Sequence, residues 1–219
     1  MKSLNDIFSD IFEPQIVHAN SGKDVVIHPY HLVHVLDQEP VNVIEPSEKG
    51  PWIAGGACLR WYQGEPVGGS DIDIFCANAM QAEQTLSRIK SWGRFTTKFK
   101  SDNAITLGYQ PKEYTVYSPM SWNLQVIIKR YYSSLQEVID NFDITACQIG
   151  FDGENWLLNP YTARDIREKN LRMTLPLHPD ATKRLTKYWT YGYRPVDGLL
   201  DTIMANPESR WAFEATEDY

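Results

Sequence analysis

IAGGA at residues 53–57 and GGSDIDIF at residues 68–75 are the two runs that decide the fold. The first places a glycine pair where a strand gives way to a helix, and the second places two aspartates in an apolar strand. Side chains alternate along a strand at about 3.3 Å per residue, so Asp71 and Asp73 lie on one face with Cα atoms roughly 6 to 7 Å apart. The isoleucines that follow each aspartate then face the core.

These two runs together predict a metal site beside a phosphate site. Neighbouring carboxylates repel each other and lose hydration unless a cation lies between them, and Mg²⁺ prefers such oxygen ligands. Gly55 and Gly56 can adopt backbone angles that other residues avoid, so main-chain N–H groups can approach a phosphate at the start of the helix. The alternatives are that the aspartates occupy a turn and an exposed edge, and that the glycines only allow close packing.

A third carboxylate is needed if two metal ions are to be held. Two Mg²⁺ ions about 3.5 to 4 Å apart require more anionic oxygens than two aspartates supply. Asp143 begins an apolar run that reads as a strand, and this strand could lie beside the first pair. Asp143 as a plain helix-to-strand turn residue is the alternative. Asp152 is a second candidate, although Asp152-Gly153 is also a hairpin signal.

The charge distribution separates a mildly basic centre from acidic flanks. The 219 residues carry 21 Lys and Arg against 28 Asp and Glu, a net charge of −7. Residues 51–194 carry 17 against 14, whereas residues 1–50 carry 3 against 8 and residues 195–219 carry 1 against 6. The centre is therefore compatible with a polyanionic substrate, and the flanks suggest surfaces for a protein partner.

The cysteines and the apolar content indicate a cytoplasmic protein that does not contact a membrane. No run approaches 18 apolar residues, and the start lacks the pattern of a signal peptide. Cys58, Cys76 and Cys147 match no metal-ligand spacing and read as small buried hydrophobes in a reducing compartment. No zinc site is implied.

Three histidines near the start also invite a metal hypothesis. His28, His31 and His34 are spaced by three residues, and on a helix each step of three rotates the side chain by about 60°. The three side chains therefore do not converge easily on one ion, and surface or capping roles are the favoured interpretation.

From residue 52 the pattern alternates between strands and helices. Strands are expected at 52–54, 71–76, 94–100, 104–109, 112–117, 122–130, 144–151 and 155–158. Helices are expected at 56–64, 79–92, 134–141, 162–170, 179–191 and 196–204. The helix at 79–92 would bury Leu86, Ile89 and Trp92, and Ser134 with Glu137 forms a capping box. Before residue 52 we expect a helix at 4–12, a strand at 24–27 and a proline-marked loop at 40–51.

The motifs in this order resemble the head domain of the nucleotidyltransferase superfamily that includes DNA polymerase β. The resemblance is strongest to the poly(A) polymerase and CCA-adding tRNA nucleotidyltransferase group, which shows GGAVRD, GxPV and DID. This chain has GGAC at 55–58, GEPV at 64–67 and DID at 71–73. The later segments SLQE, DIT, NPY, DI and LR, at 134–137, 143–145, 159–161, 165–166 and 171–172, resemble those that follow in the group. The resemblance spans residues 52–172.

The resemblance implies a reaction and roles for several residues. Asp71 and Asp73 would ligate two Mg²⁺ ions, with Mn²⁺ as an alternative, and Asp143 would bind the metal that lowers the pKa of the attacking hydroxyl. A nucleoside triphosphate would react by in-line displacement with pyrophosphate as leaving group. The expected nucleotide-binding residues near the glycine pair are Gly55, Gly56, Arg60 and Ser70.

The segment at residues 178–194 interleaves basic and aromatic side chains. Lys183, Arg184 and Lys187 are suited to phosphates, and the aromatic residues between and after them are suited to a stacked base. The alternative is a solvated basic face opposite a core stripe of Leu185, Tyr188 and Trp189. In both interpretations the helix packs against the nucleotide cleft.

We therefore predict an α+β fold: a nucleotidyltransferase-type mixed β-sheet with packed helices and a small C-terminal helical region. The predicted domains are an N-terminal extension at 1–50, a catalytic head at 51–160 and a helical region at 161–219. The predicted function is Mg²⁺-dependent transfer of a nucleoside monophosphate to a hydroxyl acceptor on RNA, including a tRNA end, or on a protein. The alternatives are a catalytically silent nucleotide-binding or protein-interaction module, and a toxin-like regulatory nucleotidyltransferase.

Overall fold

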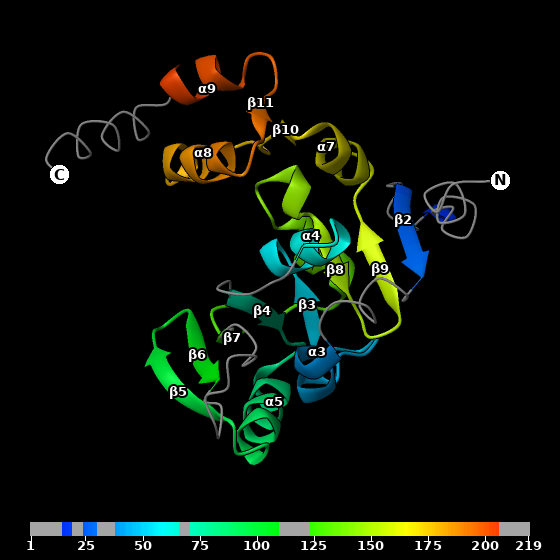
Figure 1. Cartoon of the computed structure of the whole chain (residues 1–219), viewed down its shortest axis with the longest axis vertical. Helices are drawn as coiled ribbons and strands as arrows, with labels where there is room; N and C mark the ends of the chain where they lie inside the picture. The colour runs from blue at the N-terminus through cyan, green and yellow to red at the C-terminus, as the bar shows by residue number, and fades with distance from the viewer. Residues whose placement is uncertain (1–14, 19–23, 30–37, 66–70, 110–122, 206–219) are drawn as a thin grey trace, which may run out of the picture.

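The computed structural model describes residues 15–18, 24–29, 38–65, 71–109 and 123–205 (Figure 1). Its strands are β1 (Gln15–His18), β2 (Asp24–Pro29), β3 (Trp52–Ala54), β4 (Asp71–Phe75), β5 (Phe95–Lys100), β6 (Ala104–Tyr109), β7 (Asn123–Ile127), β8 (Ile149–Phe151), β9 (Asn155–Leu158), β10 (Asn170–Leu171) and β11 (Arg194–Pro195). Its helices are α3 (Gln38–Ile44), α4 (Gly56–Tyr62), α5 (Ala79–Ser91), α6 (Leu135–Asp140), α7 (Thr162–Glu168), α8 (Ala181–Thr190) and α9 (Leu199–Ala205), with a 3₁₀ turn η2 (Thr145–Cys147).

A nine-stranded mixed sheet organises these elements. Its strand order is β1-β2-β9-β8-β3-β4-β7-β6-β5, and β10 and β11 form a separate parallel pair. β4 lies near the middle, antiparallel to β3 and parallel to β7. The predicted α+β class with a mixed sheet is confirmed.

The two faces of the sheet follow from the alternation along β4. Ile72 and Ile74 are fully buried, as predicted, and share a core cluster with residues of α3, α4 and α5. Phe75 shares the second cluster with residues of β3 and α6. Asp73 pairs in register with Ala54, which belongs to that second cluster, so both aspartates point to the face that carries α6. α6 packs on β3, β8 and β9, and the face continues beyond it over β4, β7, β6 and β5.

The C-terminal elements lie at one end of the molecule. α7, α8 and α9 are at that end in Figure 1, whereas α5, β5 and β6 are at the other. α8 buries Ala181, Thr182, Leu185 and Tyr188. Trp189 is 46% exposed and stacks under Arg194, so the predicted core stripe is correct for Leu185 and Tyr188 and wrong for Trp189.

Most predicted elements are found within a few residues of their expected bounds, and three further local predictions are wrong. Residues 40–44 of the expected loop at 40–51 belong to α3, because proline is tolerated in the first turn of a helix, where its missing N–H has no partner to lose. The expected strand at 144–151 begins instead with the η2 turn, and only β8 is extended. α5 buries Ile89 as predicted and Leu86 in part, but its other buried residues are Ala82 and Thr85, and Trp92 at the end of the helix is 42% exposed.

Several predictions fall outside the described residues. These are the helix at 4–12, the strand at 112–117, the residues His31, His34 and Ser70, and the side chain of His28. The division into three domains also stays a prediction. Within the described ranges, no helix is long and apolar enough to cross a membrane.

Candidate active site

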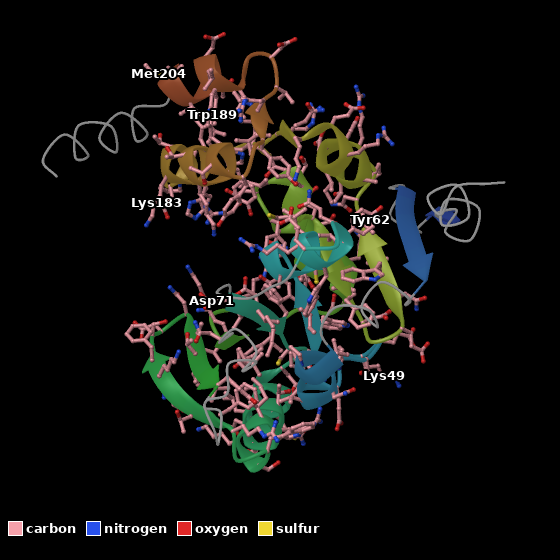
Figure 2. The ribbon with its side chains drawn as sticks, viewed as in Figure 1. Lys49, Tyr62, Asp71, Lys183, Trp189 and Met204 are labelled. Carbon is pink, nitrogen blue, oxygen red and sulfur yellow. The ribbon has the colours of Figure 1, made fainter. Side chains whose placement is uncertain are left out.

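A cavity of about 690 Å³ separates the acidic end of β4 from α8. Asp71 and Asp73 line it from the sheet, and Lys183 and Lys187 line it from α8. Figure 2 labels Asp71 and Lys183 on the two sides of this opening. Carboxylates and ammonium groups therefore face one another across a space that can hold a charged ligand.

The cavity brings together most of the residues expected from the sequence. The predicted residues that line it are Gly56, Arg60, Asp71, Asp73, Asp143, Lys183, Arg184 and Lys187. Gly55 is not among the lining residues. These residues come from four separate parts of the chain, so their gathering at one cavity is a result of the tertiary fold.

The charged form of Asp73 is disfavoured by its surroundings. Burial and, to a smaller extent, the charge of Asp71 raise its pKa to about 7, against the opposing effect of Lys187. A carboxylate in such surroundings gains from a cation placed against it.

Asp71 is exposed and is held by a neighbour on the adjacent strand. Asn123 Nδ2 donates a hydrogen bond to Asp71 Oδ1 at 2.9 Å, and the two residues are paired in register between β4 and β7. One oxygen of this carboxylate is therefore oriented by the protein.

Asp143 reaches the cavity by a route that differs from the prediction. It lies between α6 and η2, and its backbone C=O accepts a hydrogen bond from Thr174 N at 2.8 Å, so it is not part of a strand beside β4. Its Oδ1 forms an ion pair with Arg184. Its Oδ2 is buried and has no hydrogen-bond partner among the described residues.

The carboxylates that line the cavity have the chemistry of a divalent-cation site, because they offer hard oxygen donors. As they stand, no three His, Cys, Asp or Glu side chains in the described ranges are grouped to hold a metal ion. The chemistry nevertheless fits Mg²⁺, because Asp71 and Asp73 are hard oxygen donors on one strand face and Asp143 Oδ2 is a buried acceptor without a donor. In this structure Arg184 supplies the positive charge for Asp143.

Gly55 is required by packing. Its φ is +87°, and a Cβ there would lie 2.7 Å from ring atoms of Phe142. The Phe142 ring also packs edge-on against Phe75, with ring centroids 5.8 Å apart. The missing side chain at Gly55 therefore makes room for the ring of Phe142, which is the residue before Asp143 in the sequence. This agrees with the close-packing alternative. Gly56 has open space at its Cβ position and lines the cavity.

Further residues of the cavity were missed by sequence reasoning. Lys169 caps α7 in the left-handed conformation and lies over the ring of Tyr193 at 4.8 Å. Arg60 lies over the ring of Tyr191 at 5.4 Å. The basic residues lining the cavity are Arg60, Lys169, Lys183, Arg184 and Lys187, and the acidic ones are Glu65, Asp71, Asp73, Asp143 and Asp180. The tyrosines were not missed: Tyr188, Tyr191 and Tyr193 belong to the aromatic residues that the sequence indicated as suited to a stacked base, and all three line the cavity.

Cys147 also lines the cavity, but it is not a nucleophile. Burial raises its pKa to about 12, so the thiol is neutral at physiological pH. Its Sγ lies 2.6 Å from Tyr188 Oη, which joins η2 to α8. All three cysteines are free and buried, which confirms their prediction as small buried residues.

Residues 22–169 match the family model described as Gabija anti-defense 2 family protein. No curated protein matches the chain.

Solved structures of CCA-adding enzymes share the fold. An apo form has a TM-score of 0.55 at 14% identity, covering 94% of this chain and 48% of that chain. A complex with CTP has a TM-score of 0.53 at 17% identity, covering 84% and 45%. The Thermotoga maritima enzyme complexed with tRNA has a TM-score of 0.53 at 14% identity, covering 84% and 44%. This chain therefore spans less than half the length of these enzymes, and the likeness shows a nucleotidyltransferase-like fold.

Proposed function

The chain belongs to the Gabija anti-defense 2 family and has a nucleotidyltransferase-like fold, and from this premise we propose that it is a metal-dependent nucleotidyltransferase. It would transfer a nucleoside monophosphate from a nucleoside triphosphate to a hydroxyl acceptor and release pyrophosphate. The observation that carries the proposal is the pairing, across one cavity, of the Asp71 and Asp73 carboxylates with the basic face of α8.

The carboxylates are assigned to the cation-binding side. Asp71, Asp73 and Asp143 would hold Mg²⁺ or Mn²⁺, which would neutralise phosphoryl oxygens and lower the pKa of the attacking hydroxyl. Release of Asp143 from Arg184 would free both of its oxygens for this role.

The basic side is assigned to the phosphates. Lys183 and Lys187 are exposed on α8 and face the cavity, so their ammonium groups can neutralise the triphosphate and the departing pyrophosphate. In the transfer step the acceptor oxygen forms a bond to the α-phosphorus, and the bond from that phosphorus to the bridging oxygen breaks. The electron pair leaves with pyrophosphate, and the acceptor proton passes to solvent.

The acceptor is proposed from the comparisons. The solved relatives are described with CTP, ATP and tRNA, so a nucleotide donor and an RNA acceptor suit the fold. The family description implies that its members counteract a defence system called Gabija. We therefore propose a cytoplasmic enzyme that modifies an RNA end or a protein hydroxyl on which that defence depends.

A second candidate is a catalytically silent protein that opposes the defence by binding. Two observations favour it. Arg184 is ion-paired with Asp143, and no three His, Cys, Asp or Glu side chains among the described residues are grouped to hold a metal ion. In that case the carboxylates would not be needed for the anti-defence effect.

One experiment separates the two candidates. The wild type and the Asp71→Asn/Asp73→Asn double variant are incubated with each α-labelled nucleoside triphosphate, Mg²⁺ and cellular RNA and protein, and both are tested for inhibition of Gabija in cells. Enzymatic function predicts that the variant loses label transfer and inhibition together, whereas Asp102→Asn, in the exposed β5–β6 turn, keeps both. Inhibition that survives in the double variant would establish the silent alternative.

A further inference from the structure

A lysine on the edge strand of the sheet is connected to the acidic end of β4 through one intervening side chain. Lys98 Nζ, on β5, donates a hydrogen bond to Asn123 Oδ1 at 2.9 Å, and Asn123 Nδ2 donates to Asp71 Oδ1 at 2.9 Å. Because the strand order is β4-β7-β6-β5, the lysine side chain crosses the whole width of β6 to reach β7.

A bulge in β5 directs this lysine. Thr97 pairs with Leu107 and Phe99 pairs with Thr106, so Lys98 is the extra residue between two consecutive partners. Leu107 is fully buried on the core face, whereas Thr106 is in register with Gln125 and belongs to the face of the aspartates. A bulge turns a side chain away from the regular alternation, and here it turns Lys98 toward the aspartate face.

A glycine in β6 leaves the path open. A Cβ at Gly108 would lie 2.8 Å from Lys98 Cγ and would overlap its Cδ and Cε. Gly108 is in register with Asn123, so the lysine stem passes over Gly108 directly toward the amide that it contacts. Any other residue at this position would displace the lysine.

The direction of the hydrogen bonds gives the chain of contacts a chemical consequence. An ammonium group can only donate and an ionised carboxylate can only accept, whereas an amide can turn its oxygen or its NH₂ either way. With Lys98 in place, the amide oxygen of Asn123 faces the lysine and the NH₂ faces Asp71.

We propose that Lys98 is a positioning residue that fixes the amide of Asn123 and, through it, the Asp71 carboxylate for cation binding. This inference rests on the proposed function, because it concerns a carboxylate assigned there to the metal. Without Lys98, the amide can turn its oxygen toward Asp71, and the carboxylate loses its fixed orientation. Residues that orient a metal ligand in this way typically change affinity by about 10- to 100-fold.

The test is the affinity for Mn²⁺ alone, measured by titration calorimetry without nucleotide. Lys98→Met keeps the length of the side chain and removes the donor, and we expect binding about 10-fold weaker than wild type with an unchanged melting temperature. Simple removal of a positive charge near the carboxylates would instead strengthen cation binding. The sign of the change therefore separates positioning from general electrostatics.

Two further variants make the test independent of the lysine itself. Gly108→Ala displaces Lys98 without changing it, so it should weaken Mn²⁺ binding by the same factor. The Lys98→Met/Gly108→Ala double variant should bind Mn²⁺ no more weakly than either single variant. Lys100→Met removes an exposed lysine from the same strand and should not weaken binding.

The outcomes are distinguishable from failure of the proposed function. Mn²⁺ binding by Lys98→Met that equals or exceeds the wild type overturns the positioning role alone. Failure of the wild type to bind Mn²⁺ more tightly than Asp71→Asn overturns the positioning role and the proposed metal site together.

Discussion

Asp73 is a single residue whose ionised side chain lowers the stability of the folded protein. Its carboxylate is partly buried beside a second carboxylate, and its pKa is raised to about 7. Between about pH 4 and pH 7 the unfolded chain loses a proton that the folded chain keeps, so stability falls as pH rises through that window. Above pH 7 the loss is complete.

Asp73→Asn is therefore expected to stabilise the metal-free protein. In EDTA at pH 8 the gain should be on the order of 1 to 2 kcal/mol, smaller than the full pKa shift implies because the side chain is partly hydrated. The gain should shrink toward zero as the pH is lowered to about 4. Urea unfolding at both pH values measures it, and a gain that does not depend on pH would contradict this account.

Asp143 and Arg184 form an ion pair in a partly buried place, and each side chain supplies the counter-charge of the other. The side chains are 15% and 36% exposed, so removal of one partner leaves a charge with incomplete hydration.

Arg184→Met should lower the free energy of unfolding by about 1 to 3 kcal/mol in EDTA, because Asp143 loses its counter-charge. Mg²⁺ should recover part of this loss if the ion binds Asp143. Lys183→Met, on the exposed face of the same helix, is the matched control and should change stability by less than about 0.5 kcal/mol. Equal losses in both variants would show that the ion pair contributes nothing.

At the scale of elements, the start of α6 shows what local sequence can specify. Ser134 Oγ accepts a hydrogen bond from Glu137 N at 3.2 Å, as the capping box predicts. The Glu137 carboxylate accepts from Ser133 N at 2.8 Å, one residue earlier than the motif implies, and also pairs with Arg130. The hydrogen bonds from Ser133 and Arg130 lower the pKa of Glu137.

Glu137→Gln should therefore reduce the melting temperature at neutral pH by a few degrees or less. The carboxylate is stabilised in the folded state, so its contribution is complete above about pH 4.5 and is lost as pH falls through the lowered pKa. The difference between variant and wild type should close below that pH. A thermal melt series from pH 7 to pH 3 measures the difference. Gln136→Glu, on the same helix, is not a suitable control, because Gln136 donates hydrogen bonds to Asp140 and Asn159.

The segment after α6 shows where local sequence is insufficient. Its apolar residues predict a strand from residue 144, yet η2 forms there. The backbone is instead paired with a distant segment: Ile144 bridges to Met173, and Thr145 N donates to Arg172 O at 3.0 Å. These partners lie 27 or more residues away in the chain, so residues 143–147 could not show which partners they would find.

At the scale of the whole molecule, the cavity joins β4 to a helix more than 100 residues later in the chain. Leu185 and Tyr188 bury one side of α8, and this turns the lysines of the other side toward the aspartates. The basic face therefore lies opposite an apolar face, and it also lines the cavity, whereas its contact with phosphates stays a prediction.

Loss of this basic face should weaken nucleotide binding without unfolding the protein. Lys183→Met/Lys187→Met should raise the dissociation constant for a nucleoside triphosphate with Mg²⁺ by roughly 10-fold or more, because each exposed cation beside a phosphate contributes on the order of 1 kcal/mol. The wild-type affinity should fall with added salt more steeply than the variant's.

Calorimetric titration measures both effects. Lys49→Met/Lys90→Met removes two exposed lysines that do not line the cavity and serves as the control. Equal affinities in the two double variants would remove α8 from the nucleotide site.

The sequence was sufficient for the features that depend on neighbouring residues. Alternation along residues 71–75 placed Asp71 and Asp73 on one face and the isoleucines in the core, and turn residues marked β6 and β9 to the residue. These are consequences of backbone geometry over a few positions, and the same run of motifs indicated the nucleotidyltransferase-like fold.

Features that depend on distant residues required the folded chain. Three contacts join segments that no local pattern connects. Arg184 pairs with Asp143, the Phe142 ring occupies the space beside Gly55, and the Lys98 side chain passes over Gly108. Their physical basis is side-chain volume and charge at contacts created by packing. Local periodicity therefore locates the carboxylates, whereas packing decides which cations and amides meet them.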